Sequence, residues 1–292
     1  MTMHAAAPIT DLSVQCRVRA MLDYCLPALA LLASLVGAPA QAQSSFEVGV
    51  SPSRFEVSGK SGGRVGQALT VFNLGSAPTE VAIRTLDWTF SEDGNIGYHD
   101  ELLPGSCRPW VTLERRSIRV PAQGKASFRF QIDLPADAPR GECRFMLAVE
   151  GVEPAHRALI ESGGASLSLP VSGRIAVVVY LAVNGAEPSL EVQQVGMKEI
   201  EGKRTPVVTV RNTGDAHGRL EGGLQSVDAK GVAFDLLPDN SPILPGQTRT
   251  LALAPGPGTQ DNKPPPEPTW PVTSRGQLDW EKGSFKVNAE FK

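Results

Sequence analysis

Apolar and polar residues alternate with a period of two after residue 43, and this pattern most limits what the chain can fold into. Every second position is apolar in residues 128–134, 143–149 and 285–291. Such alternation is typical of strands with one buried face, so Met146 and Ala148 are expected to face away from the core. Because no comparable stretch of helical period follows, we expect an all-β sandwich or barrel.

An internal repeat predicts two domains. Residues 71–77 and 210–216 each run from a strand into a turn that contains Asn and Gly. Further along each copy, residues 120–123 and 244–247 share a Pro and a Gln before another alternating strand. Two matches in the same order imply tandem copies of one β-sandwich.

Each copy has the size of an immunoglobulin-like domain. We place the junction in residues 184–188, where a long apolar strand gives way to Gly and Pro. The expected organisation is therefore two tandem immunoglobulin-like β-sandwich domains, residues 43–185 and 186–292, after a signal peptide.

Residues 1–42 have the features of a cleaved signal peptide. Arg17 and Arg19 precede an apolar run over residues 26–36, and small residues at 38–42 offer a cleavage site. The run is too short to span a bilayer, so no membrane span is expected in the mature chain. We therefore expect export to the periplasm, with the mature chain starting near Gln43.

The mature chain keeps two cysteines, Cys107 and Cys143. In an oxidising compartment two thiols of one domain usually pair, and closing this loop stabilises a fold by roughly 3–4 kcal/mol. A disulfide is the leading interpretation. A metal site is the alternative, but the mature histidines His99, His156 and His217 show no metal-ligand spacing.

Composition and motifs argue against several classes of function. The chain carries 28 Lys and Arg against 31 Asp and Glu, a net charge of −3, which disfavours nucleic acid as a partner. No Gly-x-Ser-x-Gly elbow, Walker loop or His-Glu-x-x-His motif is present. We therefore expect no enzyme activity, no catalytic residue, no metal and no cofactor.

The first strand changes phase near Pro52. Phe46, Val48 and Val50 share one phase and Phe55 falls on the other, as in a strand that leaves one sheet and joins the opposite one. Arg54 follows this kink. From the residues alone, Arg54 is interpreted as a solvated surface residue.

Residues 165–171 have the composition of an edge strand. Leu167, Leu169 and Val171 alternate with small polar residues, and Pro170 removes a backbone donor. These three side chains fit a row that another polypeptide covers by strand addition. The alternative, that they face the core of their own domain, stays open. Residues 175–183, apolar on both phases, are expected to be buried on both faces.

These segments resemble the periplasmic chaperones of the chaperone–usher pathway of pilus assembly, the PapD-like proteins. The resemblance covers most of residues 46–253 and is strongest at residues 53–55, 120–121 and 167–180. It implies two immunoglobulin-like domains and a last strand of the first domain that completes an incomplete pilus or fimbrial subunit. The subunit then passes to an outer-membrane usher. Leu167, Leu169 and Val171 match the donor row.

The resemblance also implies an anchor for the C-terminal carboxylate of the subunit, made by an arginine of the first strand and a lysine of the last. Arg54 matches the arginine, which overrides its interpretation as a surface residue. The lysine position falls on Ala176, so either Arg174 on the same strand face substitutes, or the carboxylate site is altered.

The expected function is therefore that of a periplasmic chaperone that stabilises secreted subunits by donating an edge strand. The alternative is a structural or adhesive module of two β-sandwiches, in the periplasm or at the cell surface, without chaperone activity. A neighbouring usher gene would favour the first.

Overall fold

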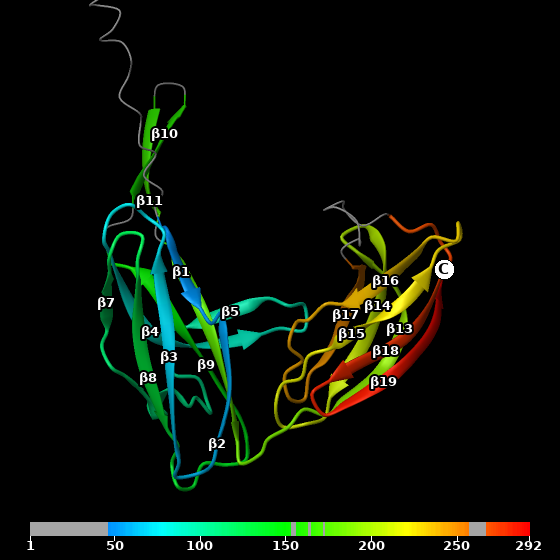
Figure 1. Cartoon of the computed structure of the whole chain (residues 1–292), viewed down its shortest axis with the longest axis horizontal. Helices are drawn as coiled ribbons and strands as arrows, with labels where there is room; N and C mark the ends of the chain where they lie inside the picture. Colours follow the sequence, from blue (N-terminus) through cyan, green and yellow to red (C-terminus); the bar gives the residue numbers. More distant parts are fainter. Residues whose placement is uncertain (1–45, 153–155, 163–164, 172, 257–266) are drawn as a thin grey trace, which may run out of the picture. The chain divides into compact units, whose positions relative to one another are not determined.

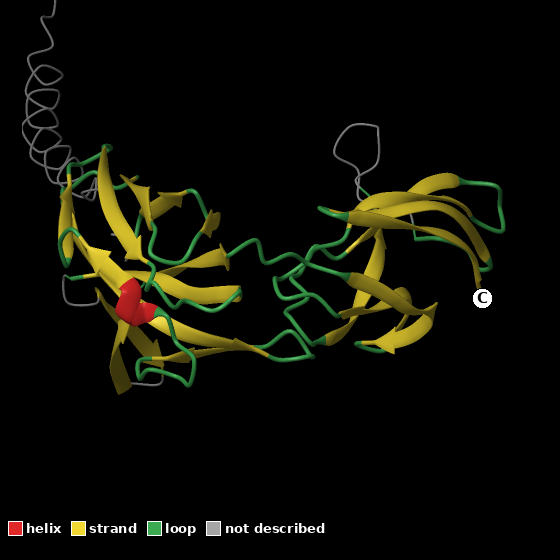
Figure 2. Cartoon of the chain, turned by 90° about the horizontal axis from the view of Figure 1, so that it is seen from below, coloured by secondary structure: helices red, strands yellow, loops and turns green. Residues whose placement is uncertain are grey.

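The structure of the protein, a computed structural model, describes residues 46–152, 156–162, 165–171, 173–256 and 267–292. In the described part, the short 3₁₀ helix η1 (Arg108–Trp110) is the one helical element among many strands (Figure 2). The strands surround two separate cores, so the predicted all-β chain of two β-sandwiches is confirmed. The expected signal peptide, residues 1–42, lies outside the described residues.

The first sandwich consists of two sheets packed on one core (Figure 1). One sheet has the strand order β1 (Val48–Ser51), β3 (Arg64–Asn73), β8 (Lys125–Asp133), β6 (Val111–Leu113). The other has the order β2 (Arg54–Gly59), β12 (Arg174–Val183), β9 (Gly141–Gly151), β4 (Thr79–Phe90), β5 (Ile96–His99), and β7 (Ser117–Val120) also pairs with β4. The largest fully buried side chains of this core are Phe128, Phe145, Leu69, Ile83, Ile132, Leu147 and Leu181.

Alternation predicts burial correctly in β8 and incompletely in β9. Phe128, Phe130 and Ile132 are buried, and Arg129 between them is exposed. In β9 the odd positions also face the core, and Met146 and Ala148 face away from it as expected, but these two are buried as well, which the alternation did not indicate. Strand β9 lies between β12 and β4, and large side chains of those strands pack beside these two on the outer face, namely Leu86, Trp88 and Tyr180.

The predicted change of sheet by the first strand is confirmed. Val48 pairs with Asn73 in β3, whereas Arg54 and Phe55 pair in parallel with Val178 and Val179 in β12. The crossing between β1 and β2 contains a cis peptide bond at Pro52. The chain thus contributes an edge strand to each sheet, one before and one after the crossing.

The second sandwich is built from seven strands in one hydrogen-bonded order. They are β13 (Leu190–Ile200), β14 (Lys203–Asn212), β17 (Thr248–Pro255), β16 (Ala233–Pro238), β15 (Glu221–Val227), β18 (Val272–Trp280), β19 (Gly283–Phe291). The first and last strands of this order also contact each other, so the sheet folds back around its core. The predicted alternation in β19 is confirmed, with Val287 and Phe291 buried and Lys286 exposed. The predicted domain limits at residues 185 and 186 fall between β12 and β13 and stay a prediction.

The repeated Asn has the same structural task in both sandwiches. The amide nitrogen of Asn73 donates to the carbonyl oxygens of Ala77 at 2.7 Å and of Pro121 at 3.1 Å, while its side-chain oxygen accepts from the Gly75 amide. Asn212 makes the corresponding bonds to Ala216, Ile243 and Gly214. Both Asn side chains are buried, so each satisfies backbone groups that water does not reach.

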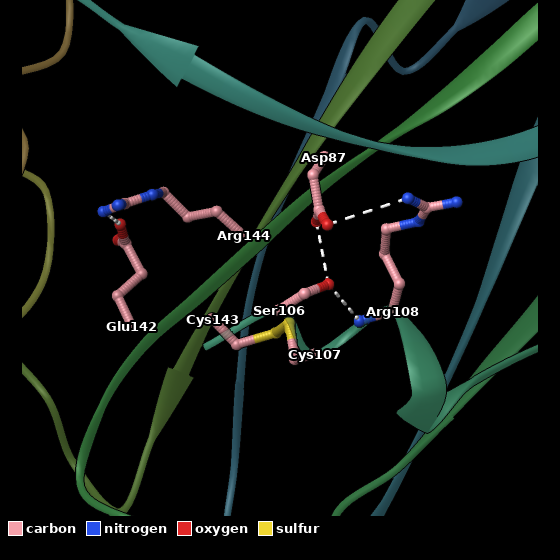
Figure 3. Close-up of a disulfide and its surroundings, with 7 residues drawn as sticks. All are labelled: Asp87, Ser106, Cys107, Arg108, Glu142, Cys143 and Arg144. Carbon is pink, nitrogen blue, oxygen red and sulfur yellow. Dashed lines mark hydrogen bonds and ion pairs between the residues drawn. A yellow bond between two sulfur atoms is a disulfide. The ribbon is translucent and has the colours of Figure 1, made fainter. Parts of the chain in front are cut away.

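Cys107 and Cys143 form the predicted disulfide, with 6.0 Å between their Cα atoms. Both are buried; Cys107 precedes η1 in the loop between β5 and β6, and Cys143 lies in β9 (Figure 3). The bond therefore ties this loop to a central strand of the sheet.

A buried carboxylate holds the same loop from the other side. Asp87 of β4 accepts hydrogen bonds of 2.9 Å from the Ser106 hydroxyl and from the Leu103 amide, and Arg108 lies 3.6 Å away (Figure 3). A buried charge is tolerated only when it is paired in this way. The loop is thus fixed by one covalent bond and by one satisfied buried charge.

Replacing the buried amide tests the repeated turn. We expect Asn73→Ala to lower the free energy of unfolding by about 1–3 kcal/mol, because it leaves buried carbonyl oxygens without a donor. Urea unfolding measures the change. The matched control is Asn288→Ala, at an exposed position of β19, for which a loss as large would contradict this role of Asn73.

Removing the disulfide tests its contribution to stability. We expect the double variant Cys107→Ser with Cys143→Ser to lose roughly 3–4 kcal/mol of unfolding free energy, because the unfolded chain regains the freedom that the closed loop denies it. Urea unfolding under oxidising conditions measures the loss, and added reductant leaves the variant unchanged. Mass spectrometry of the non-reduced mature protein is the direct check, and two free thiols would contradict the bond.

Candidate functional site

The site begins with a hairpin that extends beyond its sheet. β9 and β12 pair along their length, from Gly141 opposite Val183 to Glu150 opposite Arg174. Beyond this ladder the two chains pair again as β10 (His156–Ser162) and β11 (Ala165–Val171), which form a two-stranded sheet (Figure 1). In the sequence, residues 151–155 separate the two ladders on the β9 side and residues 172–173 separate them on the β12 side. We call the segment of β10 and β11 the ribbon.

One side of this hairpin carries an open strand edge. Within the described chain, β11 has β10 as its one partner. β12 has β9 on one side along its whole length, but β2 joins it on the other side only from Val178 onward. Among the described strands, residues 165–171 and 174–177 therefore have no hydrogen-bonded neighbour on the side that faces away from β10 and β9. We call these residues the open edge.

The predicted donor residues lie on this open edge. Leu167, Leu169 and Val171 belong to β11 and pair with Ile160, Ala158 and His156 of β10. For this ribbon the structure describes the backbone alone. That the three side chains form a row for a partner stays a prediction, and so does the alternative that they face their own core.

The ring of Phe46 packs at the point where the ribbon meets the sheet. Phe46 lies against Gly173 so closely that a Cβ atom there would overlap its ring, and a Cβ on Gly151 would lie 3.5 Å from the same ring. Gly173 is therefore needed for the close approach of Phe46. Phe46 shares the apolar phase of the first strand, and no pattern in the sequence indicates a contact with residue 173.

Arg54 stands where the open edge ends. It is the first residue of β2 and lies opposite Val178, so a strand added along the open edge would be in line with β2 and would end near Arg54. Phe55 is buried in the core, which places Arg54 on the outer face of the sheet. Its side chain is 45% exposed and forms an ion pair of 2.8 Å with Glu56.

Arg174 stands at the other end of the β12 part of the open edge. Its guanidinium forms an ion pair with Glu150, its partner across the ladder, and 44% of the side chain is exposed. Four residues of strand, about 13 Å, separate Arg174 from Val178, the partner of Arg54. Both arginines are on the outer face, and two extended guanidinium side chains can approach each other across that distance.

Between the two arginines the outer face is made of small residues. Ala176, at the position where the resemblance implies a lysine, pairs with Ala148 of β9. The structure therefore places no cation at residue 176, and it places Arg174 two residues away on the same face, as the sequence analysis expected. Ala148 is buried, and Ala176 packs against the apolar cluster of the outer face.

Sequence reasoning missed a third arginine at this site. Arg84 of β4 binds both oxygens of Glu150, Nη2 to Oε1 at 3.1 Å and Nε to Oε2 at 3.2 Å, and it also pairs with Asp100. The hydrogen bond from Arg84 holds the pKa of the Glu150 carboxyl below its usual range, and the charge of Arg174 adds to the effect. Arg84 and Glu150 lie 66 residues apart, so no local pattern could have indicated the pair.

The site consists of strand backbone and charged side chains. Among the described residues, no group of three or more His, Cys, Asp or Glu could hold a metal ion. In the same part of the chain, no helix has the length and apolarity needed to cross a membrane. An unpaired strand edge can bind backbone groups of another chain, and arginines beside it can bind carboxylates.

Comparisons with known proteins point to similar folds and to no close relative. No family model and no curated protein matches the chain. Similar solved structures include the class 5 fimbriae chaperone CfaA, with a TM-score of 0.44, 12% identity, and coverage of 82% of this chain and 98% of that one. The Escherichia coli chaperone DraB gives a TM-score of 0.41 at 15% identity, with 84% and 99% covered.

A third similar structure holds the Salmonella enterica SafA pilin in complex with the SafB chaperone, with a TM-score of 0.42, 16% identity, and coverage of 85% and 99%. All three TM-scores lie below 0.5, so the likeness reaches neither individual residues nor partners. These three similar structures are thus of chaperones, each at low sequence identity to this chain.

Proposed function

We propose that the protein is an exported chaperone that binds incomplete secreted subunits by strand addition. The observation that carries this proposal is the open edge, which has one partner strand where a strand inside a sheet has two. Catalysis is no part of the proposal, and no cofactor is needed. Binding and release of a polypeptide are its whole activity.

The low stability expected of a two-stranded ribbon supports the proposal that a partner strand binds it. An isolated two-stranded ribbon is marginally stable in water, and an unpaired edge invites pairing with other chains. A client strand along residues 165–177 satisfies those backbone groups and turns the ribbon into a three-stranded sheet. Such addition takes its affinity from main-chain hydrogen bonds and its specificity from alternate side chains.

In this proposal, Leu167, Leu169 and Val171 fill the groove of the client. Burying three aliphatic side chains contributes several kcal/mol, at about 25 cal/mol per Å² of apolar surface. The same contact covers client surface that would otherwise aggregate. Specificity then depends on whether the client has pockets at the spacing of alternate strand residues.

We assign the anchoring of the client's C-terminal carboxylate to Arg54 and Arg174. A strand that follows the open edge would end in line with β2, which brings its terminus to Arg54. A guanidinium can bind a carboxylate through two parallel hydrogen bonds. Arg174 can therefore act in place of the lysine that the resemblance implies at the position of Ala176.

The nature of the partners follows from the resemblance of the sequence. We propose pilus or fimbrial subunits as clients and an outer-membrane usher as the acceptor. Residues 1–42 act in this proposal as the signal peptide for export to the periplasm. Residues 43–185 and 186–292 then form the two domains of the mature protein.

The donor row is tested by a charge at its centre. We expect Leu169→Glu to abolish client capture, at least tenfold, because the client's apolar groove cannot take a carboxylate. The measurement is co-purification of small secreted proteins from the periplasm, together with binding of a short acetylated peptide of alternating valine and threonine. The matched control is Ser168→Glu, which places the same charge on the opposite phase and keeps capture.

Circular dichroism and urea unfolding of the Leu169→Glu variant separate binding from folding. A folded variant that no longer captures clients supports the donor row. An unfolded variant would show that Leu169 belongs to the core of its own domain. Equal loss in both variants would remove the distinction between the two faces of β11.

The carboxylate anchor is tested at Arg54. We expect Arg54→Ala to weaken binding of the free-acid valine–threonine peptide roughly tenfold, and to leave binding of its amidated form unchanged, because the lost bond is charge-assisted. The matched control is Arg64→Ala, which removes an exposed arginine paired with Asp133 in the opposite sheet. Unchanged affinity of Arg54→Ala for the free acid would contradict the anchoring role.

A further inference from the structure

We propose that Glu150 is a built-in competitor of the client's carboxylate, because it holds Arg174 on the side of β12 that faces away from the open edge. The inference rests on the proposed function, since it concerns how a client terminus is gripped. It assigns a role to Glu150 and Arg84, which neither the sequence pattern nor the family resemblance indicates.

The order of the strands carries the argument. In their sheet, β9 lies on one side of β12 and β2 lies on the other. Beside Arg174, no described strand pairs with β12 on the β2 side. Glu150 belongs to β9, so its ion pair with Arg174 lies across the closed ladder. A client strand would arrive on the other side of β12. The guanidinium of Arg174 is therefore paired with β9, on the side of β12 opposite to the one where a client strand would bind.

Glu150 is itself held firmly. Arg84 binds it through two hydrogen bonds of 3.1 and 3.2 Å, a bidentate geometry that fixes the carboxylate plane. Asp100 pairs with Arg84 in turn. The charges of Arg84, Glu150 and Arg174 alternate across three neighbouring strands, β4, β9 and β12, so the row ends on a cation beside the open edge.

The competition follows from the charges and the exposure. Glu150 is the more buried partner, with a side chain 24% exposed, while Arg174 is 44% exposed and has room to move. The hydrogen bond from Arg84 keeps the Glu150 carboxyl ionised, since it lowers its pKa. A client carboxylate must therefore draw Arg174 away from Glu150, and it must itself approach the negative charge of Glu150. Both effects weaken capture, as suits a chaperone that must release what it binds.

Removing the charge of Glu150 tests the inference. The probes are the acetylated valine–threonine peptide with a free carboxylate and the same peptide with an amidated end. Glu150→Gln removes the charge and keeps the shape of the side chain. We expect the free-acid peptide to bind this variant about three- to tenfold more tightly, the effect of one charge about 6 Å away at the surface of a protein, and the amidated peptide to bind as before.

Two further variants control the measurement. Asp133→Asn removes the same charge from another exposed arginine pair, that with Arg64 in the opposite sheet, and is expected to leave both affinities unchanged. Arg174→Ala in the Glu150→Gln background is expected to abolish the gain. Urea unfolding of each variant is measured alongside, so that a binding change is compared between folded proteins.

The sign of the change decides the outcome. Equal or weaker binding of the free acid by Glu150→Gln would overturn the inference, because it would mean that Glu150 aims Arg174 at the client instead of withholding it. An equal gain for both peptides would overturn it too, because the effect would then not concern the carboxylate. In both cases the proposed function survives. If neither peptide binds any variant, strand addition fails and the inference fails with it.

Discussion

The structure of the first sandwich depends on an incomplete pairing. β12 has β9 beside it along its whole length, but β2 covers its other side only from Val178 to Val183. The reason is the crossing of the first strand, because the residues that would have continued β2 belong to β1 and pair with β3 in the opposite sheet. One change of sheet thus provides an edge strand for each sheet and leaves part of β12 without a second neighbour.

The remainder of the sandwich keeps that edge in place. The disulfide of Cys107 and the buried Asp87 fix the loop between β5 and β6 to β9 and β4, the strands that continue the sheet beyond β12. Phe46 packs at Gly173, where the ribbon leaves the sheet. The β12 part of the open edge therefore belongs to a paired ladder, and a strand that pairs with it meets backbone groups that β9 already holds in register, which lowers the entropy lost on binding.

In the proposed function, the charges beside the edge add selectivity to this backbone surface. Arg54 marks the end of the edge, and Arg174 lies beside its unpaired part. Each is paired with an acid of the same chain, Glu56 or Glu150, so neither is a free cation in the empty protein. Exposed ion pairs of this kind are weak, which makes them exchangeable for the carboxylate of a partner.

Features that depend on local pattern or on covalent chemistry could be predicted before the fold was known. Alternation located β8 and β19, the repeated Asn and Gly located matching turns at Asn73 and Asn212, and the shift of phase at Pro52 located the change of sheet. Tertiary structure alone decided which strands pair. It buried Met146, gave Arg174 to Glu150 and brought Arg84 beside them, because these contacts join residues far apart in the chain. A one-dimensional pattern records which face of a strand is apolar, but it does not record which neighbour lies across the ladder or on which side the ladder stops.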